Sequence, residues 1–255
     1  MKVVDFEKLK SFEELYDGSY TQITRCVYEN TEYALKTFTR PDVFFNNFTQ
    51  RKFEHISNLQ LNYSVIPKYF VRKENEYFGY LMDRGIPYQK QEMSYLEKYH
   101  ALMDIKKSII QLAENGIIHG DIHAGNILLI HGNAYLCDFD DCDYLNGLFF
   151  ETNPILLTLE ARDFLKRNFN TKSLDIHLFN ILTFKELNRC DFQFDRRFPT
   201  SKAEIECEIQ RKRYGVFKNR FSKKLLKAML EYKTTDFLID TIDESDVKRY
   251  FLNKK

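Results

Sequence analysis

Residues 119–129 read HGDIHAGNILL, and residues 135–141 read YLCDFDD. Each stretch combines polar residues, carboxylates among them, with a short apolar run of the kind that forms a buried strand. Mg²⁺ takes oxygen ligands and keeps room for the phosphates of a substrate, and the oxygens of Asn126 and Asp138 suit it. Asp121 lies five residues before Asn126, where it can accept a proton without being a ligand. The two stretches therefore predict a site that handles phosphate and a divalent metal.

This order of residues resembles the catalytic and metal loops of the protein-kinase-like superfamily, which read H-x-D-x-x-x-x-N and D-F-G. The resemblance implies that Asp121 is the catalytic base that orients an attacking hydroxyl, and that Asn126 and Asp138 hold Mg²⁺. Gly120 stands in place of the usual arginine and His123 in place of the usual lysine. In these two respects, and in D-F-D-D, the chain is similar to aminoglycoside-phosphotransferase-like small-molecule kinases.

The chain before this site carries further parts of the superfamily in the expected order. Residues 33–36, YALK, resemble the strand V-A-I-K, and the period of two along a strand puts Ala34 and Lys36 on one face. The resemblance implies that Ala34 lies against adenine and that Lys36 reaches the α- and β-phosphates. Helical spacing predicts a helix within residues 44–61, and Glu54 in that helix is the implied partner of Lys36.

Two weaker matches complete the implied nucleotide site. The stretch YDGSYTQI aligns with the glycine-rich loop G-x-G-x-x-G-x-V, but only the middle glycine, Gly18, remains, with Ile23 in the place of the valine. A loop with one glycine still points backbone N–H groups at phosphate, with less freedom. The stretch YFGYLMD resembles the last strand of the small lobe where it enters the hinge, which implies that Met82 and Asp83 lie near adenine.

Residues 173–182 resemble the long buried helix of protein kinases, with Leu174, Leu178 and Ile181 at core spacing. An Asp near the start of such a helix, here Asp175, can accept N–H bonds from the catalytic loop. The alternative is an exposed Asp that the helix dipole favours.

Composition sets further limits. The chain has 255 residues, 44% of them hydrophobic and 29% charged, as is ordinary for a soluble globular protein. A net charge of +1 gives no overall field that would attract nucleic acid or an anionic membrane. The early charges argue against a signal peptide, and the apolar runs are too short to span a bilayer. Five scattered cysteines without zinc spacing fit a reduced, cytoplasmic setting, in the organism that makes the chain or in a host cell.

One local exception to the even charge is the segment 211–227, which holds eight Lys or Arg with aromatic residues between them. It either docks an acidic partner, nucleic acid or a lipid surface, or is the solvated face of an amphipathic helix. No feature of the sequence indicates an oligomeric state.

The expected fold class is α+β, a two-lobed protein-kinase-like fold with a small β-rich lobe at residues 1–83 and a larger helical lobe at residues 84–255. Period-two and aromatic patterns predict strands, and a three-to-four-residue repeat predicts a long helix that Asn115-Gly116 ends. The predicted strands are 20–28, 32–38, 68–72, 77–82, 126–130 and 134–137, and the long helix covers about 96–112.

The implied activity is ATP- and Mg²⁺-dependent phosphotransfer, with the Ser or Thr hydroxyls of a protein as first choice of acceptor. Roughly 30 residues separate Asp83 from Gly116, which leaves little room for the substrate-binding helical insertion of small-molecule kinases. Two alternatives stay open: a kinase for a sugar, aminoglycoside or similar alcohol, and a pseudokinase that binds partners without turnover, which the poor glycine loop keeps possible.

Overall fold

The computed structural model describes most of the first 144 residues and several later segments. The described residues are 1–18, 20–45, 47–140, 142–144, 174–187, 224–225, 228 and 236–251. Ser173, the first residue of the expected buried helix, and nearly all of the basic segment 211–227 lie outside them, so what the sequence indicates for these parts stays a prediction.

A six-stranded sheet forms the first part of the chain. In spatial order its strands are β1 (Lys2–Asp5), β5 (Tyr69–Lys73), β6 (Glu76–Asp83), β4 (Thr31–Phe38), β3 (Thr21–Tyr28) and β2 (Lys10–Asp17). The pair β1 and β5 is parallel and the other neighbours are antiparallel. The turn from β3 to β4 passes through Glu29 and Asn30, both with positive φ, as a tight hairpin requires. Four predicted strands are confirmed here as β3, β4, β5 and β6.

Both faces of the sheet are buried along β4. Ala34 and Phe38 belong to the main core, whereas Tyr33 and Leu35 belong to a second, smaller core on the opposite face. This follows from the alternation of side chains along a strand. Lys36 is two residues from both Ala34 and Phe38, so it lies on the same face of the strand and points toward the main core.

Two helices cover the main-core face of the sheet. They are α1 (Pro41–Phe44) and α2 (Asn47–Ser57), so the predicted single helix within 44–61 is shorter than expected and is preceded by a separate turn of helix. Phe53 of α2 packs against the rings of Tyr80 and Phe70, with centroid distances of 5.2 and 6.4 Å. These contacts fix which side of α2 faces the sheet.

The later helices pack on one another. The helix α3 (Tyr95–Glu114) ends at Asn115 and Gly116, where Gly116 has a φ of +71°, as the predicted stop requires. It contacts α5 (Leu174–Leu187) and α8 (Glu244–Phe251), and α5 contacts the short η5 (Leu238–Thr241). Most side chains of α5 are buried, which confirms a buried helix at this point of the chain.

Short strands connect the two parts. The hairpin of β9 (Ile127–Ile130) and β10 (Asn133–Leu136) turns through His131 and Gly132, both with positive φ, and both predicted strands are confirmed. Outside this hairpin, β7 (Ile86–Pro87) pairs with β9, while β8 (Ile117–Ile118) pairs with β11 (Asp143–Tyr144).

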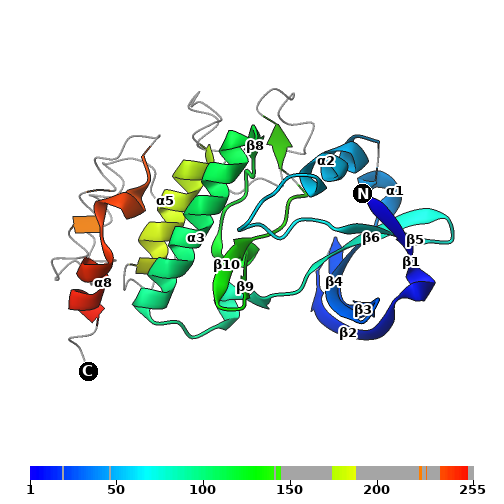
Figure 1. Cartoon of the computed structure of the whole chain (residues 1–255), viewed down its shortest axis with the longest axis horizontal. Coiled ribbons are helices and arrows are strands. Elements are labelled where there is room, and N and C mark those ends of the chain that lie inside the picture. Colours follow the sequence, from blue (N-terminus) through cyan, green and yellow to red (C-terminus); the bar gives the residue numbers. More distant parts are fainter. Residues whose placement is uncertain are drawn as a thin grey trace.

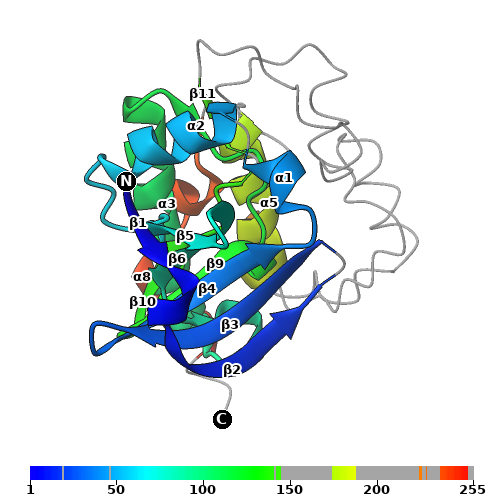
Figure 2. The same cartoon turned by 90° about the vertical axis from the view of Figure 1, so that its right-hand side faces the viewer.

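The arrangement is α+β, with a β-rich sheet first and helices later, and it is compatible with a two-lobed molecule. Figure 1 shows the six-stranded sheet at one end, α3, α5 and α8 at the other, and β9 and β10 between them. Figure 2 looks onto the sheet, whose strands β2, β3 and β4 curve across the view. Within the described residues, none of the helices is both long enough and apolar enough to cross a membrane.

Candidate active site

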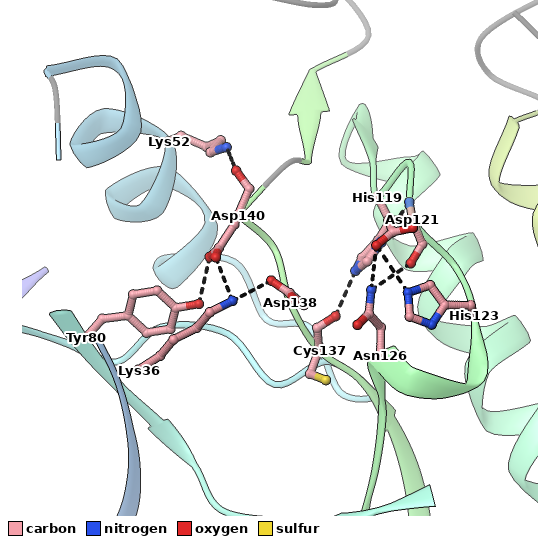
Figure 3. A network of polar contacts seen from close by, with 10 residues as sticks. All are labelled: Lys36, Lys52, Tyr80, His119, Asp121, His123, Asn126, Cys137, Asp138 and Asp140. Atoms are coloured by element: carbon pink, nitrogen blue, oxygen red, sulfur yellow. Dashed lines mark hydrogen bonds and ion pairs between the residues drawn. The ribbon is translucent and has the colours of Figure 1, made fainter. Parts of the chain in front are cut away.

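Lys36 is a buried cation between two carboxylates (Figure 3). It is 4% exposed, and its Nζ lies 2.8 Å from Asp138 Oδ1 and 2.6 Å from Asp140 Oδ2. Burial lowers the pKa of Lys36, but the charges of Asp140 and Asp138 raise this pKa by more, so the ammonium stays charged. A buried charge is stable only with such partners.

The two carboxylates differ in their surroundings. Asp138 has a φ of +69°, a conformation that is rare outside glycine, and its side chain is 40% exposed. Partial removal from water raises the pKa of Asp138, but Lys36 lowers it by more, so this pKa lies below its ordinary value. The side chain of Asp140 is 11% exposed, and burial raises the pKa of Asp140 to about 6 despite Lys36. Tyr80 donates a hydrogen bond of 2.7 Å to Asp140 Oδ1.

The implied pair of Lys36 and Glu54 is not formed in the structure. The side chain of Glu54 is half-exposed, and its Oε1 lies 3.8 Å from the main-chain amino group of Met1. The buried stripe of α2 runs through Phe53 and Ile56. At 100° per residue, Glu54 falls to the side of that stripe and points away from Lys36.

Sequence reasoning missed Lys52, which α2 directs into the site. Lys52 is 5% exposed, donates to the main-chain oxygen of Asp140, and donates a bond of 3.2 Å to the main-chain oxygen of Cys142. Its position in the sequence predicts this burial, because Lys52 lies four residues before Ile56 and therefore on the buried stripe of the helix. The helix contributes a cation where the resemblance implied a carboxylate.

Asp121 lies in a compact set of hydrogen bonds. Its Oδ2 accepts from Asn126 Nδ2 at 2.9 Å and from His123 Nε2 at 3.2 Å. Gly125 N–H donates to His123 Nδ1, which assigns the ring proton to Nε2. Asp121 Oδ1 is buried and has no hydrogen-bond partner among the described residues. Burial raises the pKa of Asp121, but the bond and charge of His123 lower it by more, so the carboxylate is ionised at neutral pH.

His119 connects this loop to residues 137–140, the stretch implied to bind the metal. It is fully buried, its Nε2 donates to the main-chain oxygen of Cys137 at 2.9 Å, and its Nδ1 accepts from Asp121 N–H at 3.3 Å. Its ring also packs edge-on against Phe139, with a centroid distance of 5.0 Å. Cys137 N–H donates to Asn126 O at 2.9 Å, so the hairpin brings Asn126 next to the residue that precedes Asp138.

The donor set fits Mg²⁺ bound together with phosphates. The side-chain amide of Asn126 donates both of its hydrogen bonds to Asp121 through its nitrogen, which turns its oxygen to the other side. Asp138 adds a partly exposed, ionised carboxylate. The described residues contain no cluster of three or more His, Cys, Asp or Glu that would hold a metal unaided. Mg²⁺ in phosphate-binding sites usually takes one or two protein oxygens and completes its shell with water and phosphates, and Asn126 and Asp138 offer two such oxygens.

The other residues implied at the nucleotide lie on neighbouring strands. Ala34 is the register partner of Met82, both are buried, and Ile23 is the partner of Lys36. Asp83 is partly exposed and pairs with the ammonium of a nearby lysine, Lys68, at 2.6 Å.

Gly18 follows β2, at the turn toward β3. Its N–H donates to Thr21 O at 2.9 Å, so this donor is used inside the turn. A Cβ at Gly18 would come within 2.6 Å of the ring of Tyr16, an exposed side chain that would have to move aside.

A comparison with protein-family models finds no match. A protein of Dictyostelium discoideum described as "Probable serine/threonine-protein kinase gdt4" is 23% identical over 205 residues. The match covers 72% of this chain, and the chain spans 12% of the length of that protein. The similarity is distant, and it suggests a protein-kinase-like relationship and a kinase activity.

Proposed function

We propose that this chain is an ATP- and Mg²⁺-dependent phosphotransferase that moves the γ-phosphate of ATP to the hydroxyl of a Ser or Thr in a protein. The observation that carries the proposal is the carboxylate of Asp121. Asn126 and His123 hold its Oδ2, while its buried Oδ1 has no partner among the described residues. An ionised oxygen in that state is an acceptor for the proton of a hydroxyl. The distant match to a serine/threonine kinase supports the same reaction.

In this reaction the chain acts through position and charge. Asp121 accepts a hydrogen bond from the acceptor hydroxyl and orients its oxygen toward the phosphorus. Lys36 keeps its positive charge in a dry setting and offsets negative charge on the phosphate oxygens. Asn126 and Asp138 are the proposed ligands of Mg²⁺, which supplies positive charge to the phosphates when bound.

We assign residues 1–83 to a small lobe and residues 84–255 to a larger lobe of a protein-kinase-like fold, with the nucleotide between them. The register of β3, β4 and β6 supports this assignment, because it sets the proposed adenine and phosphate contacts side by side. These contacts are Ile23, Ala34, Lys36, Met82 and Asp83, and the proposed phosphate contact Gly18 follows the neighbouring strand β2.

A protein acceptor is favoured by the chain between Asp83 and Gly116. This part of the molecule is fully described and contains β7, the short η2 (Tyr88–Lys90) and one long helix, α3. It has no helical insertion of the kind that encloses a small substrate. The second candidate, a kinase for a sugar or aminoglycoside, is favoured by His123, which holds Asp121 where protein kinases have a lysine.

The first test follows labelled γ-phosphate. The protein is incubated with labelled ATP, Mg²⁺, a pool of Ser- and Thr-containing peptides, and a mixture of sugars and aminoglycosides. Peptide and small-molecule products are then separated and counted. Label in peptides supports the first proposal, and label in the small molecules supports the second. If neither pool takes up label although ATP binds, the chain is a binding module and the proposed reaction is wrong.

The second test separates positioning from binding. Asp121→Asn should lower turnover by about 10²-fold or more, the scale of a general base, while ATP affinity stays nearly unchanged. Lys36→Met should weaken both, because the ammonium meets phosphate in the ground state and the transition state. Asp240→Asn, at an exposed ion pair of η5, is the matched control and should behave as wild type. Wild-type turnover in Asp121→Asn would exclude the mechanism.

A further inference from the structure

Asp140 lies where the sheet and α2 meet the metal loop (Figure 3). Its Oδ2 is 2.6 Å from Lys36 Nζ, and its Oδ1 accepts from the hydroxyl of Tyr80 at 2.7 Å. Lys36 and Tyr80 are register partners on adjacent antiparallel strands, so both side chains lie on one face of the sheet. The main-chain oxygen of Asp140 accepts from Lys52 of α2. Both oxygens of one buried carboxylate are thus held by the sheet.

The helix does not provide a carboxylate for Lys36 within the described residues. Glu54 lies on the outer side of α2, half-exposed and beside the amino group of Met1. Lys52, on the inner side, carries the same charge as Lys36 and bonds to main-chain oxygens of the metal loop. The negative charge at Lys36 therefore comes from Asp138 and Asp140.

We infer that Asp140 is the positioning residue for Lys36, in the place that the resemblance gave to Glu54. The inference rests on the proposed phosphotransfer. Asp138 also contacts Lys36, but Asp138 is the proposed metal ligand and its side chain is 40% exposed, against 11% for Asp140. The deeper carboxylate, held in addition by Tyr80, is the partner that stays with Lys36 when Asp138 faces a metal.

This arrangement changes what controls the lysine. Where a helix carboxylate holds the lysine, movement of that helix releases it. Here Lys36, Tyr80 and Asp140 belong to two neighbouring strands and to the metal loop. The position of Lys36 then depends on the metal loop and is independent of the side chains on the outer face of α2.

The turnover of two variants shows whether Asp140 or Glu54 is the partner that positions Lys36. Asp140→Asn keeps the shape of the side chain and removes its charge, and it should lower kcat for ATP by about tenfold or more, because Lys36 is no longer fixed. It should also raise the KM for ATP, since Lys36 meets the phosphates before and during transfer. Glu54→Gln should stay within about twofold of wild type in both constants, the range of an exposed side chain without a role in the site.

A milder pair of variants covers the case in which Asp140→Asn folds poorly. Tyr80→Phe removes the hydroxyl that holds Asp140 and leaves the ring in the core, so kcat should fall by less than in Asp140→Asn. Tyr77→Phe is the matched control from the same strand, because Tyr77 packs against Phe45 and Phe70 at a distance from the carboxylate. The control should have wild-type turnover.

A double-mutant cycle in urea tests the contact without any turnover. Lys36→Met and Asp140→Asn should be strongly non-additive, with the double variant unfolding near the midpoint of one single variant. Lys36→Met and Glu54→Gln should shift the midpoint additively.

The outcomes separate the two proposals. One outcome is a non-additive urea result for Lys36 and Asp140 together with no phosphotransfer by the wild type or by any variant. It would overturn the proposed function and, with it, the positioning role of Asp140. Phosphotransfer in wild type, together with additive shifts for Lys36 and Asp140 or a larger kcat loss in Glu54→Gln, would overturn the inference alone.

Discussion

Asp175 is a buried carboxylate that binds the N–H groups of the two residues before Asp121. Its two oxygens accept from His119 N–H and Gly120 N–H, each at 2.8 Å, and the residue is 4% exposed. Burial raises the pKa of Asp175, and it stays above the ordinary value although His119 and the two N–H donors lower it. The expected contact between this helix and the loop that carries Asp121 is confirmed.

Replacing Asp175 by Ala should lower the free energy of unfolding by about 2–4 kcal/mol, because two buried N–H groups lose their acceptor. The loop that carries Asp121 should loosen at the same time, so phosphotransfer should fall as well. Urea unfolding followed by circular dichroism measures the first effect. Glu114→Ala, at an exposed end of α3, is the control and should change the stability by no more than about 0.5 kcal/mol. A loss no larger than that of the control would show that the two N–H groups find water instead.

Four residues that the resemblance singled out lie close together in two pairs, while the contact implied for Glu54 is not formed. Lys36 contacts Asp138, and Asp121 contacts Asn126, whereas the roles given to these residues stay predictions. Only the resemblance implies Glu54 as the partner of Lys36, whereas the buried stripe of α2 places its neighbours, and not Glu54, toward the sheet. The contact of Asp140 with Lys36 joins parts of the chain that are remote in sequence, so no local pattern could reveal it.

At the scale of single elements, α3 begins with a capping motif that can be recognised in the sequence. Ser94 Oγ accepts from Glu97 N–H at 3.3 Å, and Glu97 Oε2 accepts from Ser94 N–H at 2.7 Å. This reciprocal pair is a capping box, and S-x-x-E before an apolar repeat is its sequence signature. The helix packs on α5, α8 and β10, so its start affects the stability of the whole helical part.

Ser94→Ala should lower the free energy of unfolding by about 1 kcal/mol, the usual cost of losing an N-cap. Ser94→Asp should restore most of that loss, because a carboxylate accepts the same bond and interacts well with the helix dipole. Thermal or urea unfolding of the three proteins measures both effects. Equal stability of Ser94→Ala and wild type would mean that water replaces the cap at this exposed helix end.

Strands with strong alternation were predicted well, and weakly patterned ones were not. The aromatic and β-branched residues of β3 to β6 match a sheet with two buried faces. By contrast, β2 is exposed along almost its whole length, so few of its residues are selected for burial. The strand β1 has four residues, and only Val4 among them is buried, which is too few for a period to be read.

At the scale of the whole molecule, the proposed ligand would connect the six-stranded sheet to the part of the molecule that carries the β9–β10 hairpin. Lys36 comes from the six-stranded sheet, whereas Asn126 and Asp138 flank the β9–β10 hairpin near the helices. The contact of Lys36 with Asp138 and Asp140 already connects these parts. Mg²⁺ and ATP bound at these residues would add a second connection.

Mg²⁺ with ATP should therefore raise the melting temperature of the wild-type protein. A ligand at about 100 times its Kd adds about 2.7 kcal/mol to the stability. Asp138→Asn should lose most of that rise, because the amide carries no charge for the metal. The rise should also disappear when EDTA replaces Mg²⁺. A full response to Mg²⁺ and ATP in Asp138→Asn would show that this residue does not hold the metal.

The parallel pairing of β1 with β5 has a consequence for how the sheet assembles. The hairpin of β3 and β4 closes over two residues, Glu29 and Asn30, and can form early. Lys2, by contrast, faces Tyr69, so β1 can pair only when the long chain between the two strands has brought β5 within its reach. Closing so long a loop is slow. Until that happens, the outer edge of β5 offers unpaired N–H and C=O groups to any other extended chain nearby, and a newly made molecule is most prone to aggregate during that interval.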